Sequence, residues 1–102
     1  MNYYTKISDA AKADFREYIH FIIAECSNII DAAKHYAGIQ NAIKELCKNP
    51  YANAVRHEKS LQRYGQDVRR VNYKKMAIIY TISGAIVNVH RIIPASMITD
   101  NC

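Results

Sequence analysis

The sequence predicts a small α+β domain in which a pair of helices packs against one sheet. Two apolar stripes at helical spacing occupy the first half of the chain, and strand-like runs separated by tight turns occupy the second half. Half of the 102 residues are hydrophobic, which is typical of a folded globule. Because this length has room for one modest core, we expect residues 1–102 to form a single domain.

The first predicted element is a short strand, because residues 3–7 combine aromatic and β-branched side chains. Ser8 is a good helix N-cap, and Asp9 in the first turn favours the helix dipole. Apolar residues then recur at helical spacing from Ala11 to Cys26, which predicts a helix over residues 9–26. Ser27-Asn28 is predicted to end this helix and to cap the next one through a short link.

A second apolar stripe runs from Ile29 to Leu46, and Asn49-Pro50 ends this helix because proline cannot continue it. The short link between the stripes predicts an antiparallel helical hairpin. Gly38 costs about 1 kcal/mol relative to alanine inside a helix, and its missing side chain would permit close packing.

The second half of the chain predicts a three-stranded antiparallel meander in the same sheet. Residues 51–66 show no clean period and favour a connector, whereas residues 67–73 predict a strand. Residues 76–82 are apolar on both faces, as in a central strand, and Ser83-Gly84 predicts a turn into a returning strand over 85–92. Pro94 ends regular pairing, so residues 94–102 are expected to form a tail.

Several classes of protein are disfavoured by composition. The N-terminal residues lack a signal-peptide pattern and no apolar run approaches a membrane span, so we expect a cytoplasmic protein without a membrane partner. The three cysteines are an odd number without a Cys-x-x-Cys pair, which argues against a disulfide framework and a structural zinc site. The four histidines lack ligand spacing and no glycine-rich phosphate loop is present, so we expect no metal and no cofactor.

The net charge of +5 is concentrated in the middle of the chain. Residues 48–75 carry eight Lys or Arg and two acids, whereas residues 1–47 carry five Lys or Arg and six acids. A localised basic block predicts a polyanionic partner, either nucleic acid or an acidic protein segment. The basic residues expected at this partner surface are Arg56, Arg63, Arg69, Arg70, Lys74, Lys75 and, from the last strand, Arg91.

Five segments in this order carry a family resemblance: a helix opening over 7–15, a helix end over 46–50, and strands over 68–73, 78–82 and 87–92. With the Arg69-Arg70 pair, the strand tyrosine Tyr80 and the final-strand Arg91, the chain resembles the RelE/ParE toxin superfamily over about residues 3–98. The resemblance implies a compact toxin held inactive by a cognate antitoxin. RelE-like members cut messenger RNA on the ribosome, whereas ParE-like members inhibit DNA gyrase and are not hydrolases.

The two activities make different demands on the residues. RNA cleavage without a metal needs a group that activates the 2′-hydroxyl, a cation at the phosphorus centre and an acid for the leaving group. The candidates for these roles in a RelE-like enzyme are Arg69, Arg70, Tyr80 and Arg91. Residues 93–98, just after the last predicted strand, contain no Arg, Lys, His or Tyr, so such a site would be incomplete.

We therefore predict a ParE-like toxin that binds a protein target such as DNA gyrase and is not an enzyme. A RelE-like, ribosome-dependent endoribonuclease acting on messenger RNA is the first alternative, and a non-toxic binding module is the second. An open reading frame for an acidic partner beside this gene would argue against the second alternative.

Strand alternation predicts where two groups of side chains point. Tyr80 shares a face with Ile78 and Ile82, which favours a packed tyrosine with a hydrogen-bonded hydroxyl over a catalytic acid. The same alternation places His90 and Arg91 on opposite faces of the last strand.

Overall fold

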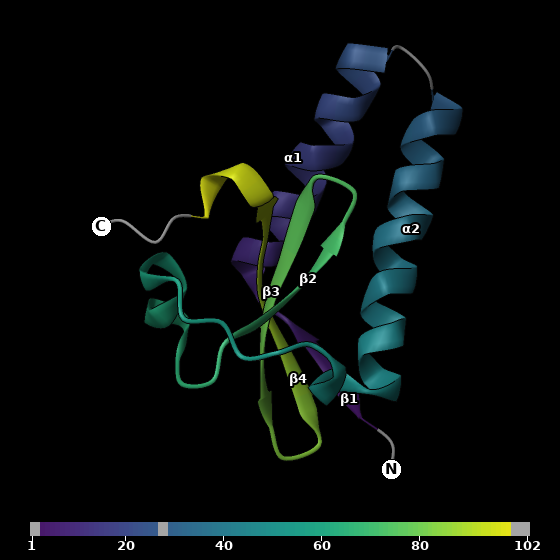
Figure 1. The fold of residues 1–102 in the computed structure, drawn as a ribbon. Helices are drawn as coiled ribbons and strands as arrows, with labels where there is room; N and C mark the ends of the chain where they lie inside the picture. The colour runs from purple at the N-terminus through teal and green to yellow at the C-terminus, as the bar shows by residue number, and fades with distance from the viewer. Residues whose placement is uncertain (1–2, 27–28, 99–102) are drawn as a thin grey trace.

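The computed structural model of the chain describes residues 3–26 and 29–98 (Figure 1). Its helices and strands are β1 (Tyr4–Ile7), α1 (Asp9–Cys26), α2 (Ile29–Lys48), β2 (Arg69–Tyr73), β3 (Met76–Ser83) and β4 (Ile86–Pro94). Short 3-10 helices occur at η1 (Pro50–Ala52), η2 (Lys59–Tyr64) and η3 (Ala95–Met97). The predicted α+β class, the helical hairpin and the three-stranded meander are confirmed.

All four strands form one sheet in the order β1-β4-β3-β2. The meander β2-β3-β4 is antiparallel as predicted, and β1 adds a parallel partner to β4, which makes the sheet mixed. The two helices lie between β1 and the meander in sequence, and such a crossover is what parallel pairing requires. Tyr4 of β1 lies opposite Ile86, and pairing continues only to Ile7 opposite Val89.

The helical hairpin covers one face of the sheet and extends beyond its edge (Figure 1). The core between helices and sheet consists of Ala11, Ile39, Ile43, Leu46, Met76, Ile78, Tyr80, Val87, Val89 and Ile92. A second, smaller core on the opposite face consists of Leu61, Val68, Ala77 and Ile79. Because β3 contributes to both cores, its apolar character on both faces is explained.

A bulge in β4 changes the direction of its side chains. Tyr80 lies opposite Val89 and Ile79 lies opposite Arg91, so His90 is an extra residue between the paired positions. His90 accordingly stacks on the Tyr64 ring, with centroids 5.6 Å apart, on the face that carries the smaller core. Arg91 lies on this face as well, because it is paired with Ile79, which belongs to the smaller core. The predicted separation of His90 and Arg91 onto opposite faces is therefore wrong, because simple alternation does not survive a bulge.

Gly38 packs against the sheet rather than against the other helix. The Tyr73 ring of β2 occupies the space where a side chain at Gly38 would lie. Close packing at this glycine is thus real, and its partner is a strand residue.

The end of the chain departs slightly from the predicted boundaries. β4 extends beyond the predicted end at residue 92 to Pro94, which lies opposite Met76 and is the last paired residue. The predicted link at 27–28, the end of the tail at 99–102 and the side chain of Cys26 lie outside the described part of the chain. None of the helices in the described segments is long and apolar enough to cross a bilayer.

Candidate functional site: a groove beside a basic turn

Tyr80 is a core residue with a fully hydrogen-bonded hydroxyl. Its side chain is 0% exposed, and its hydroxyl donates to the carbonyl oxygen of Pro50 at 2.7 Å. The hydroxyl oxygen of Tyr80 also accepts a hydrogen bond from the side-chain amide nitrogen of Asn53 at 3.2 Å. Burial raises the pKa of the Tyr80 hydroxyl above its ordinary value. The predicted packed tyrosine is confirmed, and its proton is held inside the domain.

Arg69 lies beside Tyr80 and binds the connector between α2 and the sheet. The two residues are opposite each other in the β2–β3 register. The Arg69 guanidinium donates to the Asn53 carbonyl oxygen and lies 5.1 Å from the centroid of the Tyr51 ring. Arg69 therefore anchors the segment that carries η1.

Arg70 is held by an acid from the same connector. Its Nη1 lies 3.5 Å from Oε2 of Glu58, which also accepts from the Arg56 guanidinium at 2.9 Å. The hydrogen bonds from Arg56 hold the pKa of the Glu58 carboxyl below its ordinary value, and the Arg70 charge adds to this effect. Arg56 and Arg70, both from the predicted partner surface, thus share the single negative charge of Glu58.

Arg91 is bound to α1 through Asp14. Arg91 Nε lies 2.6 Å from Asp14 Oδ2, and Arg91 Nη2 lies 2.9 Å from Oδ1. The Ile92 amide also donates to Asp14 Oδ2 at 3.1 Å. Because β1 pairs with β4 only as far as Val89, the Asp14 carboxylate satisfies an amide on the edge that β1 leaves open. The hydrogen bonds to Asp14 raise the pKa of the Arg91 guanidinium.

Sequence reasoning missed Asp14. The available signal is its place three residues after Ala11 and four before Tyr18, within the apolar stripe of the first helix. An acid on the buried stripe of a helix requires a cationic or amide partner, although its identity is not given by spacing.

The four candidates for RNA cleavage are divided between the two faces of the sheet. The register pairs Arg69 with Tyr80, whose side chain belongs to the core under the helices. It also aligns Arg70 with Ile79, and Ile79 with Arg91, on the opposite face. Arg69 and Tyr80 are therefore neighbours on adjacent strands, whereas Arg70 and Arg91 are separated by β3 and bind different carboxylates, so the four residues form no single cluster.

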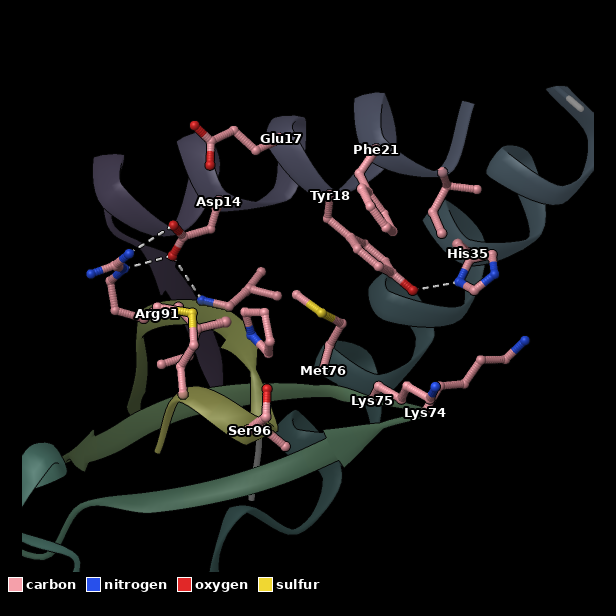
Figure 2. A pocket seen from close by; sticks show the side chains of 16 residues that line it. Asp14, Glu17, Tyr18, Phe21, His35, Lys74, Lys75, Met76, Arg91 and Ser96 are labelled. Carbon is pink, nitrogen blue, oxygen red and sulfur yellow. Dashed lines mark hydrogen bonds and ion pairs between the residues drawn. The ribbon is translucent and has the colours of Figure 1, made fainter. Parts of the chain in front are cut away.

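A groove of about 790 Å³ lies between α1, the β2–β3 turn, the end of β4 and η3 (Figure 2). Its apolar lining consists of Tyr18, Phe21, Ile22, Met76, Ile92, Ile93, Pro94, Ala95 and Met97. Phe21 is 58% exposed and Met97 is 62% exposed, which is unusual for large apolar side chains that line a hollow. On the α2 side, the Tyr18 hydroxyl and His35 Nδ1 are 2.5 Å apart.

The lysines Lys74 and Lys75 form the turn between β2 and β3 and stand at the rim of this groove. Lys74 has a φ of +54°, a left-handed conformation that costs an L-residue other than glycine about 1–2 kcal/mol. Its ammonium lies 5.8 Å from the centroid of the Tyr73 ring. Arg63 contacts Tyr64 on η2, away from this rim.

The predicted partner surface is thus divided by its contacts. Arg56, Arg70 and Arg91 form ion pairs within the chain, whereas both lysines are exposed and form no ion pair within residues 3–26 and 29–98. The same described residues contain no group of His, Cys, Asp and Glu that would hold a metal ion.

Comparison with known proteins agrees with this fold. The family model described as "ParE toxin of type II toxin-antitoxin system, parDE" matches residues 5–99. A solved structure titled "Chromosomal ParDE TA system from P. aeruginosa" matches with a TM-score of 0.72 and 17% sequence identity, over 90% of this chain and 95% of that chain. No curated protein matches the sequence significantly. Because the family model spans nearly the whole described chain, the protein belongs to the ParE toxin family and is the ParE-like toxin component of a type II toxin–antitoxin system.

Proposed function

We propose that this toxin acts in the cytoplasm by binding a protein target, such as DNA gyrase, and that a cognate antitoxin neutralises it. The observation that carries the proposal is the division of the four candidate catalytic residues between two faces of the sheet. The Tyr80 hydroxyl is buried and the Arg91 guanidinium is bound to Asp14 of α1, so one substrate phosphate would not contact all four groups.

The contacts of the individual residues support the same conclusion. The Tyr80 hydroxyl is engaged in two hydrogen bonds, Arg91 forms an ion pair with Asp14, and Arg70 shares the Glu58 carboxylate with Arg56. Removing one well-placed donor costs an enzyme roughly 10²–10³-fold in rate, so a site in which several are engaged elsewhere should be close to inactive. Residues 93–98 supply no Arg, Lys, His or Tyr that would replace them.

Exposed apolar area and uncompensated charge favour the binding of a protein partner, and the groove offers both. Phe21 and Met97 present large apolar side chains to solvent, and Lys74 and Lys75 add positive charge at the rim. Apolar patches rimmed by polar residues commonly mark interaction sites. The chemistry of this surface therefore favours an inhibitor that binds over a hydrolase.

Two assays on the purified toxin test the target class. We expect inhibition of DNA supercoiling by gyrase on a relaxed plasmid with ATP, and intact messenger RNA on programmed ribosomes. In cells, growth should stop on controlled expression and resume when the antitoxin gene is expressed as well. Site-specific cuts in translated messenger RNA, lost in a folded Arg91→Ala variant, would overturn the proposal in favour of an endoribonuclease.

A further inference from the structure

We propose that the face of the sheet away from the helices binds the sugar–phosphate backbone of double-stranded DNA. Two arginine clusters carry this surface, Arg63 with Arg91 and Arg56 with Arg70, and they flank Ile79 of β3. The surface is separate from the groove, and it accounts for the part of the basic block that the groove does not use.

The first cluster brings two guanidinium groups to one phenol. Arg63 Nη2 donates to the Tyr64 hydroxyl at 2.9 Å, and Arg63 Cζ lies 5.0 Å from the centroid of the Tyr64 ring. The pKa of Arg91 is raised mainly by Asp14, and a hydrogen bond with Tyr64 adds to this effect. Because a phenol is neutral at ordinary pH, Tyr64 orients both cations without compensating their charge.

Hydrogen-bond donors and positive charge remain at this first cluster. A guanidinium has five N–H groups, and Arg91 uses one on each of the two Asp14 oxygens. Asp14 supplies one negative charge against the two positive charges of Arg63 and Arg91. Arg63 forms no ion pair within residues 3–26 and 29–98, so this cluster is suited to bind an anion.

The second cluster lies on the other side of β3. Arg56 and Arg70 share the Glu58 carboxylate at 2.9 and 3.5 Å, which again sets two cations against one acid. The register places Arg70 and Arg91 on either side of Ile79, so their backbones are about 10 Å apart across two strand spacings. Two positive positions at this separation suit an extended polyanion, whereas a single free phosphate would reach only one of them.

The composition of this face favours nucleic acid over an acidic protein segment. Among the described residues, none of the exposed large apolar side chains comes from η2, β2 or β3. Protein–protein interfaces have an apolar centre, whereas protein–DNA interfaces are more polar and much more positively charged. Guanidinium groups also bind phosphate oxygens through two parallel hydrogen bonds.

The bulge in β4 positions the first cluster. His90 stacks on the Tyr64 ring with the two planes 25° apart, and His90 Nε2 lies 2.8 Å from Thr81 Oγ1. With regular alternation, His90 and Arg91 would point to opposite faces, and the extra residue places both beside Tyr64. Burial lowers the pKa of His90, so its neutral ring supports Tyr64 and adds no charge at neutral pH.

Direct contact with the DNA backbone would hold the toxin beside a target that works on DNA. This consequence rests on the proposed inhibition of gyrase. The binding of DNA itself does not, and it is measured without any target protein.

The experiment measures binding of the full-length toxin to a fluorescein-labelled duplex of about 20 base pairs by anisotropy, over a series of salt concentrations. We expect a Kd of roughly 10⁻⁴–10⁻⁶ M at physiological salt and tighter binding at low salt. Arg63→Gln should weaken binding about two- to five-fold and reduce the slope of log affinity against log salt by about 1. Absence of binding at low salt would overturn the inference.

A second variant should strengthen binding. Glu58→Gln removes the acid that Arg56 and Arg70 share, so the affinity for DNA should rise about two- to five-fold at neutral pH. A variant whose only defect is structural would not gain affinity, and thermal unfolding checks that each variant is folded. Weaker binding by folded Glu58→Gln would argue against the second cluster.

Matched controls make the same charge changes on the helical hairpin. Lys34→Gln on α2 and Glu25→Gln on α1 replace exposed residues away from this face, and each should change the Kd by less than about twofold. Equal effects at these positions would show that total charge and not this surface binds DNA. Equally tight binding of poly-glutamate would overturn the assignment in favour of an acidic protein segment.

Failure of the inference and failure of the proposed function are distinguishable. If the toxin inhibits supercoiling but does not bind the duplex, the target stands and the DNA surface is refuted. If the toxin binds the duplex through Arg63 but supercoiling continues, the surface stands and gyrase is refuted as the target.

Discussion

Replacing Gly38 of α2 by alanine should weaken the fold, although alanine is the better helix former. In an open helix this change stabilises by about 1 kcal/mol. Here the new methyl carbon would lie 2.1 Å from the Tyr73 hydroxyl oxygen and 2.2 Å from its ring carbon Cζ. These separations are too short for non-bonded atoms, so the Tyr73 ring or the helix must shift.

The expected magnitude follows from these two opposing effects. Tyr73 packs against the main core, and its ring lies 6.1 Å from that of His35, so movement of the ring disturbs its neighbours. Overpacking of this kind costs about 1–3 kcal/mol, and the helix gain offsets about 1 kcal/mol. Gly38→Ala should therefore lower the free energy of unfolding by up to about 2 kcal/mol.

A double-mutant cycle with Tyr73→Ala isolates the contact. Without the ring, Gly38→Ala should stabilise the protein by about 1 kcal/mol, which gives a coupling energy of about 1–3 kcal/mol. Urea unfolding, monitored by circular dichroism, gives the free energy of unfolding of all four proteins. Ala37→Gly, at an exposed neighbouring position of α2, measures the difference in helix propensity between alanine and glycine in this helix. Equal stabilisation by Gly38→Ala in both backgrounds would refute the close approach of Tyr73.

Three further predictions concern charged and titratable groups. Asp14→Ala should destabilise by about 1–3 kcal/mol in urea unfolding, because Arg91 and an edge amide of β4 lose their acceptor; an unchanged midpoint would contradict this contact. Glu58 has a lowered pKa in the fold, so its stabilising contribution is present above its ordinary pKa of 4.5 and is lost as the pH falls through the folded value. The stability gap between wild type and Glu58→Gln should thus close on acidification, and a constant gap would argue against the ion pair with Arg56. Burial lowers the pKa of His90, so protonation favours the unfolded chain below its ordinary pKa of 6.5, and His90→Gln should lose less stability than wild type as the pH falls from that value.

Local patterns in the sequence determined the elements and much of the core. The helix over 9–26 follows from an N-cap and a periodic apolar stripe, and the buried strand follows from a continuous apolar run. Tyr80 was correctly predicted as a core residue because β3 has regular alternation around it. Of the groove, the sequence indicated Lys74, Lys75 and Arg91, as members of a basic partner surface.

The tertiary structure decided what depends on residues far apart in the chain. Asp14 and Arg91 are separated by 77 positions, and nothing in the spacing of either residue selects the other. The bulge at His90 lies in the pairing of β4 with β3, and it changes which residues share a face. Phe21 was not assigned a role from the sequence, and only the tertiary structure places it in one groove with the end of β4. Helical and strand periods are properties of a few neighbouring residues, whereas pairing, bulges and grooves arise only when distant segments pack together.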